Sequence, residues 1–282
     1  MTSTVTVTSS TTGGPGATGL VVTGLRKEYG GRTAVDGVSF TLAPGGSLGI
    51  VGESGSGKTT TVRMLVGLER PDAGTVLLDG RDRSARARGR TRRRARAREI
   101  QMVFQDPYLS LDPRISVGDC LDEVLRLHFA LDAGARGRRV TELLDQVGLG
   151  EREARALPRQ LSGGQRQRVA IARALAAEPG VLVLDEAVAA LDVSVQAQIL
   201  DLLAGIRRER GIGFLFVSHD LAVVRHVTDD VMVLRAGRVV ESGPTASTLT
   251  EPRHAYTRLL LDSVPRRGWD PDRIAEDRRA LA

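Results

Sequence analysis

A glycine-rich run that ends in a lysine and two threonines carries the clearest chemistry in the chain: Gly52-Glu53-Ser54-Gly55-Ser56-Gly57-Lys58-Thr59-Thr60. Its glycines let the backbone curl so that successive N–H groups point at phosphate oxygens, and a following helix would add its positive dipole end. The lysine would place a charge on the β and γ phosphates, and the Thr59 hydroxyl is a ligand for Mg²⁺. We therefore predict that this run binds the phosphates of a nucleoside triphosphate.

Two adjacent carboxylates follow an aliphatic run. The sequence Val181-Leu182-Val183-Leu184 precedes Asp185 and Glu186, and this places both carboxylates at the C-terminal edge of a buried parallel strand, where a phosphate loop also lies. Asp185 suits the water-mediated outer shell of Mg²⁺. Glu186 projects the other way and is predicted to polarise the water that attacks the γ-phosphate.

A third motif, Leu161-Ser162-Gly163-Gly164-Gln165, precedes a predicted helix over residues 166–176. Its serine and glycine amides would form a second anion-binding helix terminus, although the chain has one nucleotide of its own to hold. Here the sequence resembles the ABC ATPase family, whose signature loop is LSGGQ, and the resemblance extends over residues 20–265. It implies that this loop in one subunit caps the γ-phosphate of ATP held by a second subunit, in a head-to-tail dimer.

The resemblance implies roles for four more residues. Tyr29, between the first two predicted strands, would stack on adenine. Gln105 would contact Mg²⁺ and the attacking water, Asp192 would cross the dimer interface in the D-loop, and His219 would contact the γ-phosphate. The predicted catalytic residues are then Glu186, His219 and Gln105, and the predicted Mg²⁺ ligands are Thr59, Gln105 and Asp185.

Two positions depart from the family pattern. Ala187 stands where importer ATPases usually have Pro, and Ala189 stands where the D-loop often has Ser. Neither change removes a side chain that binds phosphate, binds metal or transfers a proton, so we expect the chain to hydrolyse ATP. The property that these two changes could alter is coupling through the D-loop across the dimer.

Strand and helix patterns alternate along most of the chain. Strands are predicted at residues 20–25, 38–42, 47–51, 75–79, 100–104, 181–185, 213–218, 231–235 and 238–241. One helix face carries the apolar residues Val195, Ile199, Leu202, Leu203 and Ile206, and Gly211 ends this helix. This alternation predicts an α/β fold: a P-loop ATPase core with a mostly parallel sheet, an antiparallel N-terminal β part and an inserted helical subdomain.

The predicted organisation has five parts. They are a disordered tail at 1–19, the first part of the ATPase core at 20–105, a helical subdomain at 106–160, the second part of the core at 161–250, and a C-terminal extension at 251–282. Strand signals vanish in the helical subdomain, and a short helix is predicted within residues 252–261.

Composition excludes several classes of protein. Of the 282 residues 41% are apolar but only 3% aromatic, so an aliphatic α/β core is favoured over an aromatic-rich sandwich. The single cysteine, Cys120, excludes an intramolecular disulfide and Cys-rich metal sites. No apolar run approaches the roughly 18 residues of a spanning helix, and residues 1–19 lack the charged and apolar regions of a signal peptide.

The basic character of the chain is concentrated in one segment. Residues 81–98 hold ten arginines and one aspartate, a local charge of +9 against +6 for the whole chain. A face so charged cannot pack in a core, so we favour a solvated, partly helical surface insertion over a phosphate-binding role.

Two segments indicate which group of ABC ATPases the chain resembles. Gln105-Asp106-Pro107-Tyr108-Leu109-Ser110-Leu111-Asp112-Pro113-Arg114 resembles the corresponding segment of oligopeptide and dipeptide importer ATPases, and residues 252–265 resemble their C-terminal extension. The resemblance thus implies the ATP-hydrolysing subunit of an ABC importer that takes up di- or oligopeptides. Two alternatives stay open: a nickel or other small-solute importer, and a soluble nucleic-acid or ribosome-associated ABC ATPase that would use residues 81–98.

The same resemblance implies the cofactors and partners. ATP and Mg²⁺ would bind, and a second ABC ATPase subunit, identical or related, would complete the dimer. Membrane permease subunits would be direct partners and a solute-binding protein an indirect one, with no nucleic acid expected. The chain would then lie at the cytoplasmic face of the cell membrane as a peripheral subunit.

Overall fold

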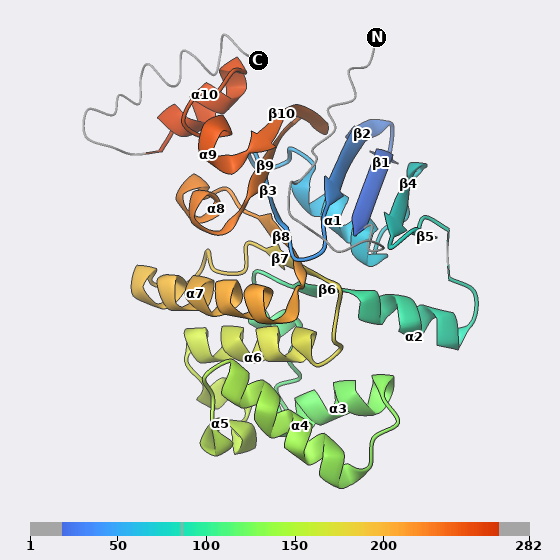
Figure 1. Cartoon of the computed structure of the whole chain (residues 1–282), viewed down its shortest axis with the longest axis vertical. Coiled ribbons are helices and arrows are strands. Elements are labelled where there is room, and N and C mark those ends of the chain that lie inside the picture. Colours follow the sequence, from blue (N-terminus) through green and yellow to red (C-terminus); the bar gives the residue numbers. More distant parts are fainter. Residues whose placement is uncertain (1–18, 86, 265–282) are drawn as a thin grey trace. The chain divides into compact units, whose positions relative to one another are not determined.

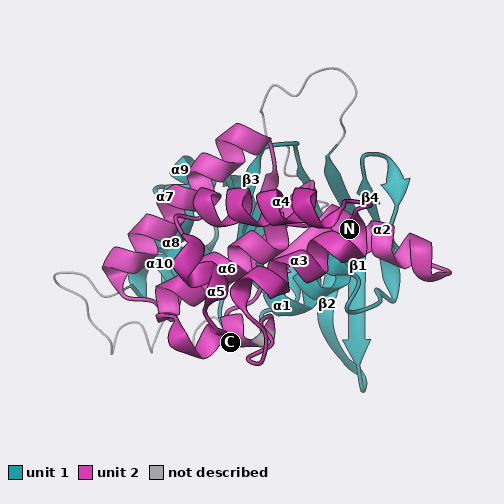
Figure 2. Cartoon of the chain, turned by 90° about the horizontal axis from the view of Figure 1, so that it is seen from below, with its two compact units in different colours: residues 1–84, 215–282 teal, residues 85–214 magenta. Residues whose placement is uncertain are grey.

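The computed structural model describes residues 19–85 and 87–264, which form two compact units. Unit 1 takes the described residues up to 84 and those from 215 onward, and unit 2 takes the described residues from 85 to 214 (Figure 2). Apart from Gly19, the predicted tail of residues 1–19 lies outside the described residues, as does the stretch from Pro265 onward.

Unit 1 contains an antiparallel sheet with the strand order β2-β1-β4-β5 (Figure 1). Leu20 pairs with Leu42 and Val22 with Phe40, and all four side chains are buried. Alternating apolar residues therefore give this sheet one core face. Its strands are β1 (Leu20–Tyr29), β2 (Arg32–Leu42), β4 (Ala73–Leu78) and β5 (Arg81–Asp82).

Unit 1 also contains parallel strands. β3 (Ser47–Val51) pairs in parallel with β9 (Asp230–Arg235), and β10 (Arg238–Pro244) returns antiparallel to β9. Every residue of β3 is buried, as expected of a strand covered on both faces. The helices of unit 1 are α1 (Lys58–Val66), α8 (Leu221–Val227), α9 (Thr245–Thr248) and α10 (Ala255–Asp262).

Unit 2 combines two parallel strands with helices. β6 (Ile100–Val103) pairs with β7 (Val181–Asp185), with Val103 opposite Leu184. Its α-helices are α2 (Arg90–Glu99), α3 (Val117–His128), α4 (Ala133–Gln146), α5 (Glu151–Arg155), α6 (Gly163–Leu175) and α7 (Val193–Arg210), and it has short 3₁₀ turns η1 (Pro107–Leu109) and η2 (Pro158–Gln160). The remaining strand, β8 (Gly213–Val217), begins in unit 2 and ends in unit 1.

All nine predicted strands are present, and the α/β class with an antiparallel part and mostly parallel strands is confirmed. The placement of Tyr29 between strands was wrong, because β1 continues to Tyr29, which pairs with Arg32 across a two-glycine turn. Polar residues from Arg26 onward end the apolar pattern, but backbone pairing continues through register shifts. The short β5 was not predicted.

One helix start also differs from the prediction. α6 begins at Gly163 and not at 166, because the Ser162 side chain caps it and the two glycines form its first turn. α4 begins at Ala133, because Asp132 provides an N-cap that outweighs the low helix propensity of Gly134 and Gly137.

The arginine-rich segment forms β5 and α2 in its described part. None of the residues of α2 is buried, which agrees with a solvated surface segment. Nowhere in the described part of the chain is there a helix long and apolar enough to cross a membrane.

Candidate nucleotide-binding site

The phosphate loop joins buried β3 to α1 and lies close to neighbouring backbone. Gly52 has φ +150° and Gly57 has φ +103°, conformations that L side chains rarely adopt. A Cβ on Gly52 would lie 2.2 Å from the Leu234 carbonyl oxygen, and one on Gly57 would lie 2.5 Å from the Ala34 carbonyl oxygen. These two positions therefore require glycine for both conformation and space.

The lysine of the loop points back along its own backbone. Lys58 is 6% exposed, and its Nζ donates to the carbonyl oxygens of Gly52 at 2.6 Å and Glu53 at 2.8 Å. The buried Ser56 Oγ has no hydrogen-bond partner within the described residues. An ammonium and an unpaired hydroxyl beside curled backbone amides are the donor groups that phosphate oxygens require.

The turn between β9 and β10 braces the loop within unit 1. The Gly237 N–H donates to the Ser56 carbonyl oxygen at 2.9 Å, and the Asp36 N–H donates to the Gly237 carbonyl oxygen at 2.8 Å. The β9–β10 turn thus connects the phosphate loop to β2. The sequence analysis missed Gly237, whose only local signal is the Ala236-Gly237 turn with positive φ at both residues.

His219 and Tyr29 occupy other edges of unit 1. The Ser218 N–H donates to the Ile50 carbonyl oxygen at 3.2 Å, so His219, which is exposed, follows a residue bound to the strand that leads into the phosphate loop. Tyr29 is 44% exposed at the end of β1, with Lys27 Nζ 5.2 Å from its ring centroid. Partial burial and the nearby Glu69 carboxylate raise the pKa of the Tyr29 phenol.

In unit 2, Gln105, Asp185 and Glu186 come together at one sheet edge. Since Val103 lies opposite Leu184 in the parallel pair, Gln105 and Glu186 are each two residues beyond that pair. Glu186 has φ +48°, a sparsely populated conformation for a residue with a Cβ. Such strain is typical of functional positions. The Ala189 N–H closes the following turn onto the Glu186 carbonyl oxygen at 3.0 Å.

The signature loop is built as a helix cap. The Ser162 Oγ accepts from the Gln165 N–H at 3.2 Å, and the Gln165 Oε1 accepts from the Ser162 N–H at 2.9 Å, forming a capping box. A Cβ on Gly164 would lie 2.5 Å from Val195 Cγ1, so the loop packs closely against the start of α7. Asp192 is the N-cap residue of α7. Unit 2 thus brings the predicted signature and D-loop residues side by side.

The segment that follows Gln105 also contacts the signature helix. The Arg166 guanidinium carbon lies 4.7 Å from the ring centroid of Tyr108, a cation–π contact between η1 and α6. Tyr108 remains 47% exposed. The sequence analysis singled out the 105–114 segment for its resemblance but missed Arg166, because no local pattern indicates this pairing.

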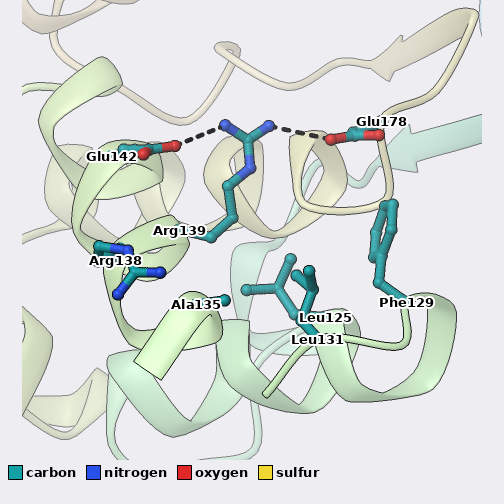
Figure 3. Close-up of a pocket in the computed structure, with 8 residues that line it drawn as sticks. All are labelled: Leu125, Phe129, Leu131, Ala135, Arg138, Arg139, Glu142 and Glu178. Atoms are coloured by element: carbon teal, nitrogen blue, oxygen red, sulfur yellow. Dashed lines mark hydrogen bonds and ion pairs between the residues drawn. The ribbon is translucent and has the colours of Figure 1, made fainter. Parts of the chain in front are cut away.

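Unit 2 has a pocket of about 400 Å³ apart from these motifs. Leu125, Phe129 and Leu131 form an apolar part of its lining, and Arg139 bonds to Glu142 at 2.9 Å and to Glu178 at 3.2 Å (Figure 3). None of its lining residues belongs to the predicted ATP site. Two carboxylates hold Arg139, and Arg138 contributes a second guanidinium to the lining.

Each unit therefore gathers part of the predicted site. Unit 1 holds the phosphate loop from Gly52 to Thr60 together with Tyr29 and His219. Unit 2 holds Gln105, Asp185 and Glu186 at one sheet edge, and the signature loop beside Asp192.

Known proteins are similar to this chain in sequence. Residues 35–189 match the family model described as ABC transporter. An oligopeptide transport ATP-binding protein of Lactococcus lactis is 44% identical over 246 residues, which are 87% of this chain and 76% of that protein. A glutathione import ATP-binding protein of Pectobacterium atrosepticum is 47% identical over 232 residues, which are 82% of this chain and 37% of that protein.

A solved structure shares the fold as well. A dimeric ATP-binding cassette in a post-hydrolysis state, bound to ADP and phosphate, superposes with a TM-score of 0.72 at 30% identity, covering 80% of this chain and 98% of that one. The family match spans more than half of the chain and includes the phosphate loop, the signature loop and both carboxylates. The chain therefore belongs to the ABC transporter family, in which it is an ATP-binding ATPase domain.

Proposed function

We propose that this chain is the ATP-hydrolysing subunit of an ABC importer that takes up di- or oligopeptides. The observation that carries the peptide assignment is the segment of residues 105–114, which resembles that of peptide importer ATPases, in a chain 44% identical to an oligopeptide transport protein. The glutathione importer relative supports the same class, since glutathione is a tripeptide.

ATP binding is assigned to unit 1. The amides and side chains from Gly52 to Thr60 hold the phosphates, with the Lys58 ammonium on the β and γ phosphates. The buried Ser56 hydroxyl and the two glycines that exclude a Cβ support this assignment. Tyr29, whose pKa is raised, stays a neutral phenol and stacks on adenine.

Hydrolysis is assigned to three side chains, those of Glu186, Gln105 and His219. Glu186 accepts a proton from water as the water oxygen attacks the γ-phosphorus in line and the bond to the β-phosphate oxygen breaks. Gln105 orients that water, and His219 donates a hydrogen bond to the γ-phosphate. Thr59, Gln105 and Asp185 would hold Mg²⁺, and their hydroxyl, amide and carboxylate oxygens are the hard donors this ion prefers. Mg²⁺ would neutralise charge that develops on the phosphates.

The second ATPase subunit supplies the signature for each nucleotide. Ser162, Gly163, Gly164 and Gln165 of one subunit cap the γ-phosphate bound by the other, and Asp192 crosses the interface. The capped start of α6 supports this role because its amides form a positive helix terminus. The dimeric state of the similar cassette supports the same arrangement.

The remaining partners follow from an importer role. Membrane permeases would bind the chain at the cytoplasmic face of the membrane, and the exposed Tyr108 ring on its 3₁₀ turn is a suitable contact for them. A solute-binding protein would be an indirect partner.

Deletion of the gene tests this proposal. The deletion strain should fail to grow on di- or oligopeptides as the sole source of a required amino acid, and the wild-type gene should restore growth. Normal peptide growth with loss of nickel-dependent enzyme activity would assign the chain to nickel import instead. Normal peptide growth together with salt-sensitive binding of nucleic acid would favour a soluble role for the arginine-rich segment.

A further inference from the structure

The C-terminal extension reaches the phosphate loop through one hydroxyl group. The Glu53 backbone N–H donates to the Tyr256 Oη at 3.1 Å, a contact between residues 203 positions apart within unit 1. Tyr256 belongs to α10 and is only 2% exposed. A distant helix therefore contributes a hydrogen-bond partner to the second residue of the loop.

Packing fixes the position of the Tyr256 ring. The ring belongs to a buried cluster with Val51, the last residue of β3, and with Leu259 of its own helix. The Arg235 guanidinium carbon lies 5.2 Å from the ring centroid. Because the ring is packed in the core, its position is fixed, and its hydroxyl is held toward the phosphate loop.

The extension is fastened where α10 begins. The Glu241 carboxylate accepts from the backbone N–H groups of Arg253 at 2.7 Å and His254 at 3.1 Å. The His254 Nδ1 accepts from the Tyr256 N–H at 3.1 Å. These bonds hold the start of α10 against β10, so the backbone that carries Tyr256 is fixed in place.

The peptide group between Gly52 and Glu53 is thus held at both ends. Its N–H, that of Glu53, donates to Tyr256, and its carbonyl oxygen, that of Gly52, accepts from Lys58 Nζ at 2.6 Å. Rotation of this peptide would move the carbonyl that helps to place the lysine ammonium, the group assigned to the β and γ phosphates.

We propose that Tyr256 is a positioning residue for ATP binding, which acts through the peptide group between Gly52 and Glu53 to hold the phosphate loop and Lys58 in a receptive conformation. The proposal rests on the proposed ATP site. It gives the C-terminal extension a part in nucleotide affinity that acts through the phosphate loop.

Tyr256→Phe keeps the packed ring and removes only the hydroxyl. The expected result is a rise of about three- to ten-fold in the KM for ATP and in the Kd for a fluorescent ATP analogue, because one hydrogen bond is lost and an amide is left unpaired. The kcat and the Tm should stay near the wild-type values, a split that a purely structural role would not produce. The matched control is Ser263→Ala, which removes a hydroxyl that bonds the Leu259 carbonyl oxygen in the same extension and should leave the KM unchanged.

Glu53→Pro removes the same hydrogen bond from the donor side and should by itself raise the KM for ATP, so it also serves if Tyr256→Phe does not fold. Proline has no N–H to donate, so Tyr256→Phe should add no further rise in KM in that background. The proposal is overturned if Tyr256→Phe leaves the KM unchanged, whether or not its Tm and kcat fall. It is also overturned if Ser263→Ala raises the KM equally, or if the effects of Tyr256→Phe and Glu53→Pro on the KM add. Failure of the wild-type protein to bind ATP would instead overturn the proposed function.

Discussion

Gly164→Ala probes the contact between the signature loop and α7. An added Cβ would lie 2.5 Å from Val195 Cγ1, more than 1 Å inside the about 3.5–4.0 Å separation at which two carbon atoms attract. Val195 is β-branched and lies in a helix, where such side chains keep one rotamer, so it cannot turn aside without cost. Overpacking of this kind costs about 1–3 kcal/mol.

A gain opposes this cost, which makes the sign of the result informative. Replacing a helical glycine with alanine stabilises by about 0.4–1 kcal/mol where space allows. The expected net effect of Gly164→Ala is therefore a loss of about 1–2 kcal/mol. Gly163→Ala is the matched control, because its Cβ would lie 3.7 Å from Leu191 Cδ2, an ordinary contact, and it should be neutral or stabilising.

The assay is chemical denaturation of the purified wild-type and variant proteins. Val195→Ala removes the obstructing methyl group, so the double variant should be more stable than the sum of the single effects by about 1–3 kcal/mol. The reasoning is refuted if Gly164→Ala stabilises the protein as Gly163→Ala does, or if Val195→Ala leaves the penalty in place.

Three further predictions use other sites. Glu186→Gln should keep ATP binding, lower turnover by about 10²–10⁴ and accumulate an ATP-bound dimer; near wild-type turnover would remove Glu186 from the role of base. Ser162→Arg and Lys58→Ala should each abolish ATPase activity, whereas a mixture of the two variants should recover activity, because mixed dimers contain one intact composite site. If the mixture recovers no activity, counting the nucleotides bound per dimer separates a wrong composite-site model from a need for both sites. Burial raises the pKa of Glu241, but the Thr257 hydroxyl and hydrogen bonds from the backbone amides of Arg253 and His254 together hold the pKa below the ordinary 4.5. The stabilisation by Glu241 is then present above about pH 4.5 and lost as the pH falls, so the Tm difference from Glu241→Gln should shrink between about pH 6 and pH 3; a constant difference would contradict this assignment.

Much of the fold could be predicted because aliphatic runs determine it. β3 and β7 have the predicted bounds, since short aliphatic runs make up most of each strand. In the predicted helix stripe Ile199, Leu203 and Ile206 are buried, whereas Val195 and Leu202 are half-buried. At Tyr29 backbone pairing continues beyond the apolar residues of β1, and no pattern in the sequence indicates this.

The site divides in the same way. Residues in short motifs, such as Lys58 and Ser162, could be chosen as candidates because their chemistry depends on local spacing. Their roles in ATP binding and hydrolysis stay predictions. Contacts between distant residues, such as Tyr256 with Glu53 and Gly237 with Ser56, could not be inferred because only the folded backbone brings them together.

The most direct test of the importer role is uptake of a labelled di- or tripeptide by cells whose only copy of the gene carries Glu186→Gln. A matched strain carries the wild-type gene, and uptake of labelled nickel is measured in parallel. We predict that peptide uptake falls to the level of the deletion strain while nickel uptake is unchanged. Peptide uptake equal to that of the wild-type strain would contradict the assignment of this chain as the ATPase of a peptide importer.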